Sequence, residues 1–233
     1  DHDLIFDLTG SSRSYWLCVL NRAKLKLGFP YRQIQNRIFY DVGVPRSDLR
    51  FEAETMLDLL QILGCKVEYP LKFEMPGEAI NADRPYIVYF PTASVPSKCW
   101  ERGHFAGLIK KAADAFPAYD HVILEGVQDW ESADDLRAKF AGKNNVKVRK
   151  SMSLDDVTSF LKGSALVISN DTGIRNLAIC CEVPTVGIFV ETLPFAYWPR
   201  FGLHDVVFNL DSSMPDVHSV FDSMTTLLGK IRA

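Results

Sequence analysis

Two polar segments, each placed after an apolar run, hold the residues of this 233-residue chain that are best suited to bind a ligand. One is the sequence NDTG at 170–173, where the chain enters a predicted helix at Thr172-Gly173. The free N–H groups at a helix start bind phosphate, while Thr172 adds a hydroxyl and Gly173 lets a ligand approach the backbone. Asp171 is a poor phosphate ligand. We expect it to cap the helix or to accept a hydrogen bond from a sugar or ribose hydroxyl.

The second segment is the loop PTASVPSK at 91–98, which follows another apolar run. It offers hydroxyl groups at Thr92, Ser94 and Ser97 and one cation at Lys98. A diphosphate needs both kinds of group, because neutral donors orient it and a cation offsets its charge. The alternative is that Lys98 is an ordinary surface lysine in a loop between a strand and a helix.

The elements that carry these segments alternate between strand-length apolar runs and amphipathic stretches along the whole chain. The pattern predicts an α/β fold with a parallel sheet. We predict strands at 4–6, 25–29, 86–90, 121–124, 146–148, 165–169 and 185–189, and helices at 12–23, 52–63, 104–116, 172–181 and 216–231. Two more helices are expected to begin after capping residues Ser132 and Ser153. The polar stretch at 76–85, which contains Pro and Gly, is the predicted linker.

Composition restricts the class of protein. A formal charge of -3 and a pI near 6.0 argue against a nucleic-acid partner. The longest apolar runs are far shorter than the roughly 20 residues that a membrane span needs. Five cysteines without a CxxC pair favour free thiols in a reducing compartment, so we predict a cytoplasmic protein. The five histidines are scattered, and we assign no metal site.

The order of the motifs resembles glycosyltransferase family 9, the ADP-heptose:lipopolysaccharide heptosyltransferases. The resemblance rests on PTASVPSKCW, LEG, SNDTG and VPTVGIF in the second part of the chain, and on DLTGSSRS and AKLKLGF in the first. It implies a GT-B fold of two Rossmann-like domains, the first incomplete: an acceptor-side domain at 1–80, a donor domain at 81–210 and a closing helix at 211–233. It also implies inverting, metal-independent transfer of heptose from an ADP-sugar to a lipopolysaccharide inner-core saccharide, without a cofactor, at the inner face of the bacterial inner membrane.

The resemblance carries site residues over one by one. Ser94 and Lys98 match family residues at the donor phosphates. The sequence Asp171-Thr172-Gly173 matches the family motif that holds the nucleotide sugar.

Three further positions follow from the same resemblance. Glu125, or an acid beyond it such as Asp129 or Glu131, is expected to reach the ribose. Asn176 stands where many members have His; Asn can form hydrogen bonds but cannot carry a positive charge. Arg13 matches an arginine on the acceptor side.

We assign no catalytic residue. Family members begin with a strand and a Gly-Asp loop whose Asp is the general base, and no such segment precedes Asp1, so we expect the chain to be shortened there. Asp7, at the end of a predicted strand, is considered as a substitute, but a structural role is favoured. The D-x-D sequence at 1–3 precedes its strand instead of following it, which argues against a metal role. The aromatic segment at 191–200, which ends in Arg200, could stack on adenine or pack as a hydrophobic loop.

Three functional hypotheses remain open at this point. The chain could be part of a family-9 glycosyltransferase, a truncated relative that binds an ADP-sugar without transfer, or an unrelated doubly wound α/β enzyme in which SNDTG occurs by coincidence. The third could also bind a nucleotide, so donor-site substitution separates it from the first two: Lys98→Ala and Asp171→Ala are expected to weaken binding of ADP or an ADP-sugar while folding survives.

Overall fold

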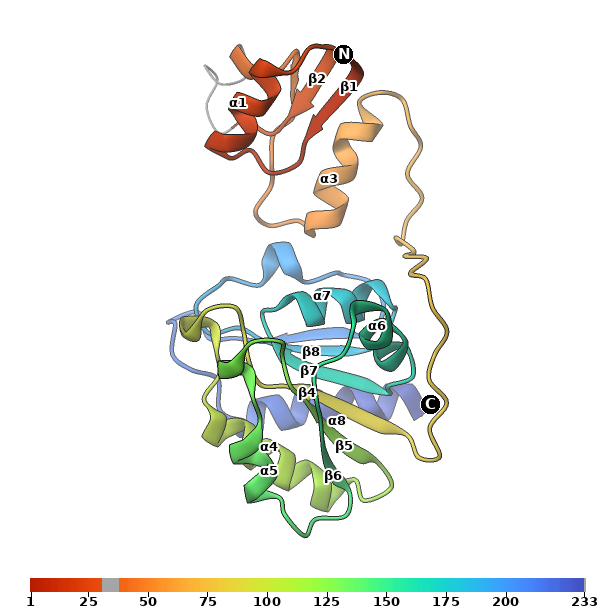
Figure 1. The fold of residues 1–233 in the computed structure, drawn as a ribbon, viewed down its shortest axis with the longest axis vertical. Coiled ribbons are helices and arrows are strands. Elements are labelled where there is room, and N and C mark those ends of the chain that lie inside the picture. Colours follow the sequence, from red (N-terminus) through yellow and green to blue (C-terminus); the bar gives the residue numbers. More distant parts are fainter. Residues whose placement is uncertain (31–37, 233) are drawn as a thin grey trace. The chain divides into compact units, whose positions relative to one another are not determined.

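Two compact units make up the computed structural model, which describes residues 1–30 and 38–232 (Figure 1). Unit 1 comprises Asp1–Leu71 together with Phe195–Tyr197, and unit 2 comprises Lys72–Pro194 together with Trp198–Ala233. Each unit contains a parallel sheet, so the predicted α/β class is confirmed. None of the described helices combines the length and the apolar character that crossing a membrane requires.

Unit 1 is built on a three-stranded sheet in the order β1-β2-β3. The strands are β1 (His2–Asp7), β2 (Ala23–Gly28) and β3 (Val42–Gly43), and the helices include α1 (Ser12–Leu20) and α3 (Glu52–Gln61). Ser11 caps α1 by accepting the N–H of Ser14, and the Ser14 hydroxyl accepts the N–H of Ser11 in return. The core of this sheet is a small apolar cluster formed by Leu27, Phe29, Val44 and Leu59.

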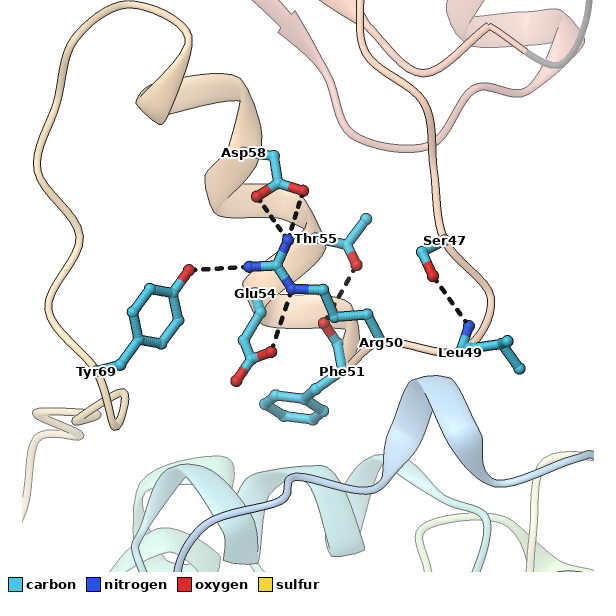
Figure 2. A network of polar contacts seen from close by, with 8 residues as sticks. All are labelled: Ser47, Leu49, Arg50, Phe51, Glu54, Thr55, Asp58 and Tyr69. Carbon is cyan, nitrogen blue, oxygen red and sulfur yellow. Dashed lines mark hydrogen bonds and ion pairs between the residues drawn. The ribbon is translucent and has the colours of Figure 1, made fainter.

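Arg50 fastens the start of α3 to the chain that follows the helix (Figure 2). Its Nη1 lies 2.8 Å from both carboxylate oxygens of Asp58, and its Nε lies 3.3 Å from Glu54. Its Nη2 donates to the Tyr69 hydroxyl at 3.0 Å. All three guanidinium nitrogens are therefore bonded within unit 1, and this cation is committed to the fold rather than to a ligand.

Asp7, at the end of β1, is a buried acid with both oxygens bonded. Oδ1 accepts the N–H groups of Thr9 and Gly10 at 3.0 Å each, and Oδ2 accepts the Tyr40 hydroxyl at 2.6 Å. Burial alone would raise the pKa of Asp7, but hydrogen bonds from Tyr40, Ser14 and the two N–H groups outweigh it and lower the pKa. These contacts support the structural role favoured from the sequence.

Unit 2 is a six-stranded parallel sheet in the order β6-β5-β4-β7-β8-β9. The strands are β4 (Tyr86–Phe90), β5 (Asp120–Leu124), β6 (Val146–Arg149), β7 (Leu166–Asn170), β8 (Thr185–Ile188) and β9 (His204–Val207). One face packs against α4 (Arg102–Ala115), α5 (Asp134–Lys139) and α8 (Val217–Arg232). The other face packs against α6 (Leu154–Lys162) and α7 (Gly173–Cys180). The sheet is therefore covered by helices on both sides.

The strand order reverses between β4 and β7, which pair in register from Ile87 with Leu166 to Phe90 with Ser169. The chain leaves β4 for a helix on one face and leaves β7 for a helix on the other. The two connections diverge and open a crevice at the carboxyl ends of these strands. In open parallel sheets, ligands bind at this point.

Two local predictions have different outcomes. Ser153 caps α6 by accepting the N–H of Asp156, as predicted. The prediction for Ser132 is wrong, because the residue before α5 is Ala133, which makes no side-chain cap. Ser132 instead ends a short 3-10 helix at Asp129–Glu131, and its hydroxyl accepts the N–H of Asp134.

The segment predicted as a linker, 76–85, lies along unit 2. The Lys162 ammonium donates to the carbonyl oxygens of Met75 and Gly77, and the Ile80 N–H donates to the Ser159 carbonyl. The division between the two units falls a few residues earlier, between Leu71 and Lys72.

We expect Tyr40→Phe to lower the free energy of unfolding by about 1.5–3 kcal/mol, because it removes a hydrogen bond to a buried carboxylate. Tyr69→Phe is the matched control: Tyr69 is 47% exposed, and the loss of its bond to Arg50 should cost less than about 1 kcal/mol. Urea unfolding measures both variants, and equal losses would contradict this account.

The contribution of Asp7 also depends on pH. Because its folded pKa lies below its unfolded value, the stabilisation is complete above about pH 4 and disappears as the pH falls through the folded pKa. The difference in the free energy of unfolding between wild type and Tyr40→Phe should therefore become smaller as the pH falls below about 4.

Candidate functional site

A pocket of about 580 Å³ opens at the carboxyl ends of β4, β5 and β7, where the strand order reverses. All of its lining residues belong to unit 2. Six of the residues singled out from the sequence line it: Ser94, Glu125, Glu131, Thr172, Gly173 and Asn176. Side chains that are widely separated in the sequence thus meet in one cavity.

Lys98 and Asp171 form an ion pair beside these residues, with Nζ 2.7 Å from Oδ2. The Asp171 side chain is 8% exposed and that of Lys98 is 30% exposed. The alternative in which Asp171 caps the helix is wrong: Thr172 is the N-cap of α7, and its hydroxyl accepts the N–H of Arg175 at 3.3 Å. Lys98 is likewise more than an ordinary surface lysine, since it reaches an acid on another strand's loop.

Asn170, the last residue of β7, joins the two loops through its fully buried amide. Its Oδ1 accepts the Trp100 N–H at 2.9 Å, and its Nδ2 donates to the Thr92 carbonyl at 3.2 Å. Trp100 is itself buried, and its ring N–H donates to the Pro215 carbonyl at 2.7 Å. The loop that carries Ser94 and Lys98 is therefore fixed at both ends.

Glu125, which follows β5, reaches the pocket with one oxygen already bonded. Oε1 accepts the Ala133 N–H at 3.1 Å and a guanidinium N–H of Arg137 at 3.0 Å. Within the described part of the chain, Oε2 has no hydrogen bond. This arrangement holds the carboxylate in one orientation and leaves an acceptor for a ligand hydroxyl.

Glu131 is the second acid in the pocket lining and is buried. Its Oε2 accepts the Gln128 N–H at 3.1 Å. The Glu131 side chain packs against the backbone of Gly126. A Cβ at Gly126 would lie 2.3 Å from the Glu131 carboxylate, so a larger residue at this position would collide with it. Asp129 is exposed and does not line the pocket, so the structure brings Glu125 and Glu131 to the cavity but not Asp129.

Much of the pocket wall is apolar, and sequence reasoning did not identify it. It is formed by Phe90, Leu124, Val127, Met152, Leu154, Val157, Ile174, Leu177 and Cys180. Most of these residues come from the ends of β4 and β5 and from α6 and α7, which cover the same face of the sheet. The strand order is the feature that could have revealed this wall. β5 and β7 flank β4, so the segments that follow these strands meet at the same edge of the sheet.

Arg175 was also missed. It lies in the first turn of α7 with a fully buried side chain, stacked on the Phe189 ring at 5.2 Å. A Cβ at Gly187 would lie 2.2 Å from its Nε, so this glycine makes room for the guanidinium. Burial lowers the pKa of Arg175 to about 10, while attraction to Asp171 and Asp205 opposes this. The group remains a cation at neutral pH.

Two candidates lie elsewhere. Arg13 is in unit 1, exposed at the start of α1. Arg200 places its guanidinium 3.9 Å from the centre of the Trp198 ring and does not line the pocket. Of the two, only Arg200 belongs to the same unit as the pocket, and it is not among the lining residues.

Comparison with known proteins gives a family match over most of the chain. The model of glycosyltransferase family 9 (heptosyltransferase) matches residues 1–221. Lipopolysaccharide heptosyltransferase 2 of Escherichia coli is 23% identical over 159 residues, which are 66% of this chain and 44% of the relative. Lipopolysaccharide heptosyltransferase 1 of Pseudomonas aeruginosa is 22% identical over 205 residues, 83% of this chain and 56% of that protein. The chain thus spans about half the length of these relatives.

Solved structures give a matching fold. The E. coli heptosyltransferase WaaC with ADP superposes with a TM-score of 0.74 at 20% identity, covering 97% of this chain and 72% of that one. A family-9 glycosyl transferase from Veillonella parvula gives 0.75 at 20% identity, covering 98% and 74%. The expected GT-B fold is therefore confirmed, over about three quarters of those chains.

Because Arg175 packs against Gly187, substitutions at these two positions should have non-additive effects on the free energy of unfolding. Gly187→Ala should lower the free energy of unfolding by about 1–3 kcal/mol, because the new methyl group collides with the guanidinium in a packed interior. In an Arg175→Ala background, the same change should cost less than about 1 kcal/mol, since the obstruction is gone. Chemical unfolding of the four proteins measures the coupling. Additive losses would contradict the contact.

Proposed function

The chain belongs to glycosyltransferase family 9, and from this premise we propose that it binds an ADP-sugar donor for inverting, metal-independent transfer of heptose to a lipopolysaccharide inner-core saccharide. The observation that carries the proposal is the pocket at the reversal of strand order. It combines the start of α7, two acids and an apolar wall, and the Lys98–Asp171 ion pair lies just before α7 without lining the pocket. Each of these parts suits a different portion of an ADP-sugar.

The diphosphate is assigned to the turn at the start of α7. Backbone N–H groups at the helix start and the hydroxyls of Thr172 and Ser94 are suited to phosphate oxygens. Gly173 has open space where a Cβ would stand, so a phosphate can approach the backbone closely. Lys98, now paired with Asp171, provides the nearby cation, which supports charge compensation by the protein's own residues.

The nucleoside is assigned to the remainder of the pocket. An adenine ring suits the apolar wall contributed by α6 and α7, such as Met152 and Leu177. Glu125 has one carboxylate oxygen available for a ribose hydroxyl, and Arg137 holds it in place. Asn176 also lines the pocket and can form hydrogen bonds with donor hydroxyls or phosphates.

The proposed reaction is a single displacement. An acceptor hydroxyl oxygen forms a bond to the anomeric carbon while the bond from that carbon to the diphosphate oxygen breaks, which inverts the centre. ADP leaves with the bonding electron pair, and the hydroxyl proton passes to a general base, to which we assign no residue. Lys98 and the N–H groups of α7 would stabilise the negative charge that develops on the leaving diphosphate.

The acceptor is assigned to unit 1 through Arg13, whose exposed cation suits an anionic core saccharide. The donor and the acceptor together lead us to propose a cytoplasmic location, at the inner face of the bacterial inner membrane.

Calorimetric titration tests the donor assignment. We expect the chain to bind ADP and ADP-heptose in preference to UDP-sugars, equally with and without a divalent cation. Lys98→Met should weaken ADP binding by about 10-fold to 100-fold, since it removes a charge-assisted hydrogen bond to phosphate. A folded wild-type protein that binds none of these nucleotides would refute the proposal.

Gly173→Ala is expected to separate binding from stability. The new methyl group enters the open space assigned to phosphate, so ADP affinity should fall at least about tenfold, although Ala favours a helix over Gly by up to ~1 kcal/mol. Gly103→Ala is the matched control, because Gly103 lies in the first turn of α4 and also faces open space. It should stabilise without changing affinity; thermal unfolding and titration measure both. Unchanged ADP affinity in Gly173→Ala would contradict the assignment of the phosphate site to the start of α7.

A further inference from the structure

The phosphate end of the proposed donor site has an unusual balance of charge. Lys98 is paired with Asp171, so these two side chains cancel, and Asn176 is neutral. Of the two acids in the pocket lining, Glu125 is paired with Arg137, and Glu131 adds negative charge. A diphosphate carries two or more negative charges, so the site needs a further cation close to α7.

Arg175 is located where such a cation would act. It lies three residues after Thr172 in the same helical turn, and its backbone N–H is bonded to the Thr172 hydroxyl. Its guanidinium is attracted to Asp171, the partner of Lys98. The side chain is fully buried, so this cation is shielded from water in the helical turn that follows the proposed phosphate site.

The slot around Arg175 is shaped for a guanidinium. Gly187 of β8 leaves room for Nε, and the guanidinium lies over the face of the Phe189 ring in a cation–π contact. Asp205 of β9 attracts it from the side of the sheet, while its carboxylate also accepts the Ser223 hydroxyl at 2.6 Å. Burying a cation costs several kcal/mol of desolvation, and an apolar side chain of similar size is often as stable or more so. Packing alone therefore does not explain why an arginine, and not an apolar residue, occupies position 175.

We propose that Arg175 is a positioning residue of the donor site: a buried cation that holds Asp171 behind the phosphate-binding turn and supplies the positive potential that a diphosphate requires. This inference rests on the proposed ADP-sugar function. Arg175 does not line the pocket, so it acts through the field and through Asp171 rather than by direct contact. In a water-excluded environment, such a field is weakly screened.

Arg175→Met tests the proposal, because methionine fills the slot without charge. We expect a folded protein whose unfolding temperature is equal to or above that of wild type and whose ADP affinity is about tenfold lower. Its affinity for adenosine, which has no phosphate, should be unchanged. Arg175→Lys retains the charge and should keep ADP affinity within about threefold.

Asp205→Asn provides a second test without removing Arg175. Asn can still accept the Ser223 hydroxyl, while the loss of one negative charge should strengthen ADP binding about twofold to fivefold. Arg175→Met with wild-type ADP affinity would overturn the proposal, as would equal losses for ADP and adenosine. If Arg175→Met does not fold, unchanged or weaker ADP binding by Asp205→Asn overturns it. Failure of wild type to bind ADP would instead refute the donor assignment itself.

Discussion

One buried amide, the side chain of Asn170, fixes the loop after β4 to the end of β7, beside the pocket of unit 2. It accepts a backbone N–H from Trp100 and donates to the Thr92 carbonyl, the two ends of the loop that carries Lys98. A carboxylate could accept but not donate, and a hydroxyl is too short to span both contacts. Both backbone groups would otherwise be buried without these bonds, which costs about 1–3 kcal/mol each. The loop is thus ordered before any ligand arrives.

The sheet topology explains why this amide lies where it does. β4 and β7 are neighbours although about 80 residues separate them, and their connections leave toward opposite faces. Asn170 therefore ends its strand directly beside the end of β4. From there the side chains alternate in charge, from Lys98 through Asp171 to Arg175. Each charge has an opposite neighbour, so the cluster can remain largely buried without a net penalty comparable to that of an isolated ion.

The sequence predicted the parts of this arrangement that depend on periodicity and chain order. Apolar runs located β4, β5, β7 and β8, and the family resemblance selected Ser94, Glu125 and Thr172, which the structure brings to one pocket. It missed β9, because the strand His204–Val207 has two polar residues in four and is defined by pairing with β8.

Side-chain partners were harder to predict than the elements. Asp171 was considered a cap, although Thr172 caps α7, because only the packed structure brings Lys98 to the acid. Arg175 has no local signal as a buried cation, since its side chain fits only because a glycine stands opposite it on the next strand. Local pattern thus located the pocket, while long-range packing determined its electrostatics.

The location of the charges has a consequence for how pH should affect this protein. The pKa of Arg175 falls only to about 10, so this cation keeps its charge throughout the neutral range. If it contributes to donor binding, that contribution is constant between about pH 5 and pH 9. A pH dependence of transfer within this range then arises from groups other than Arg175. Because all residues that line the pocket belong to unit 2, comparing the pH profiles of nucleotide affinity and of transfer separates groups at the proposed donor site from groups that act only in transfer.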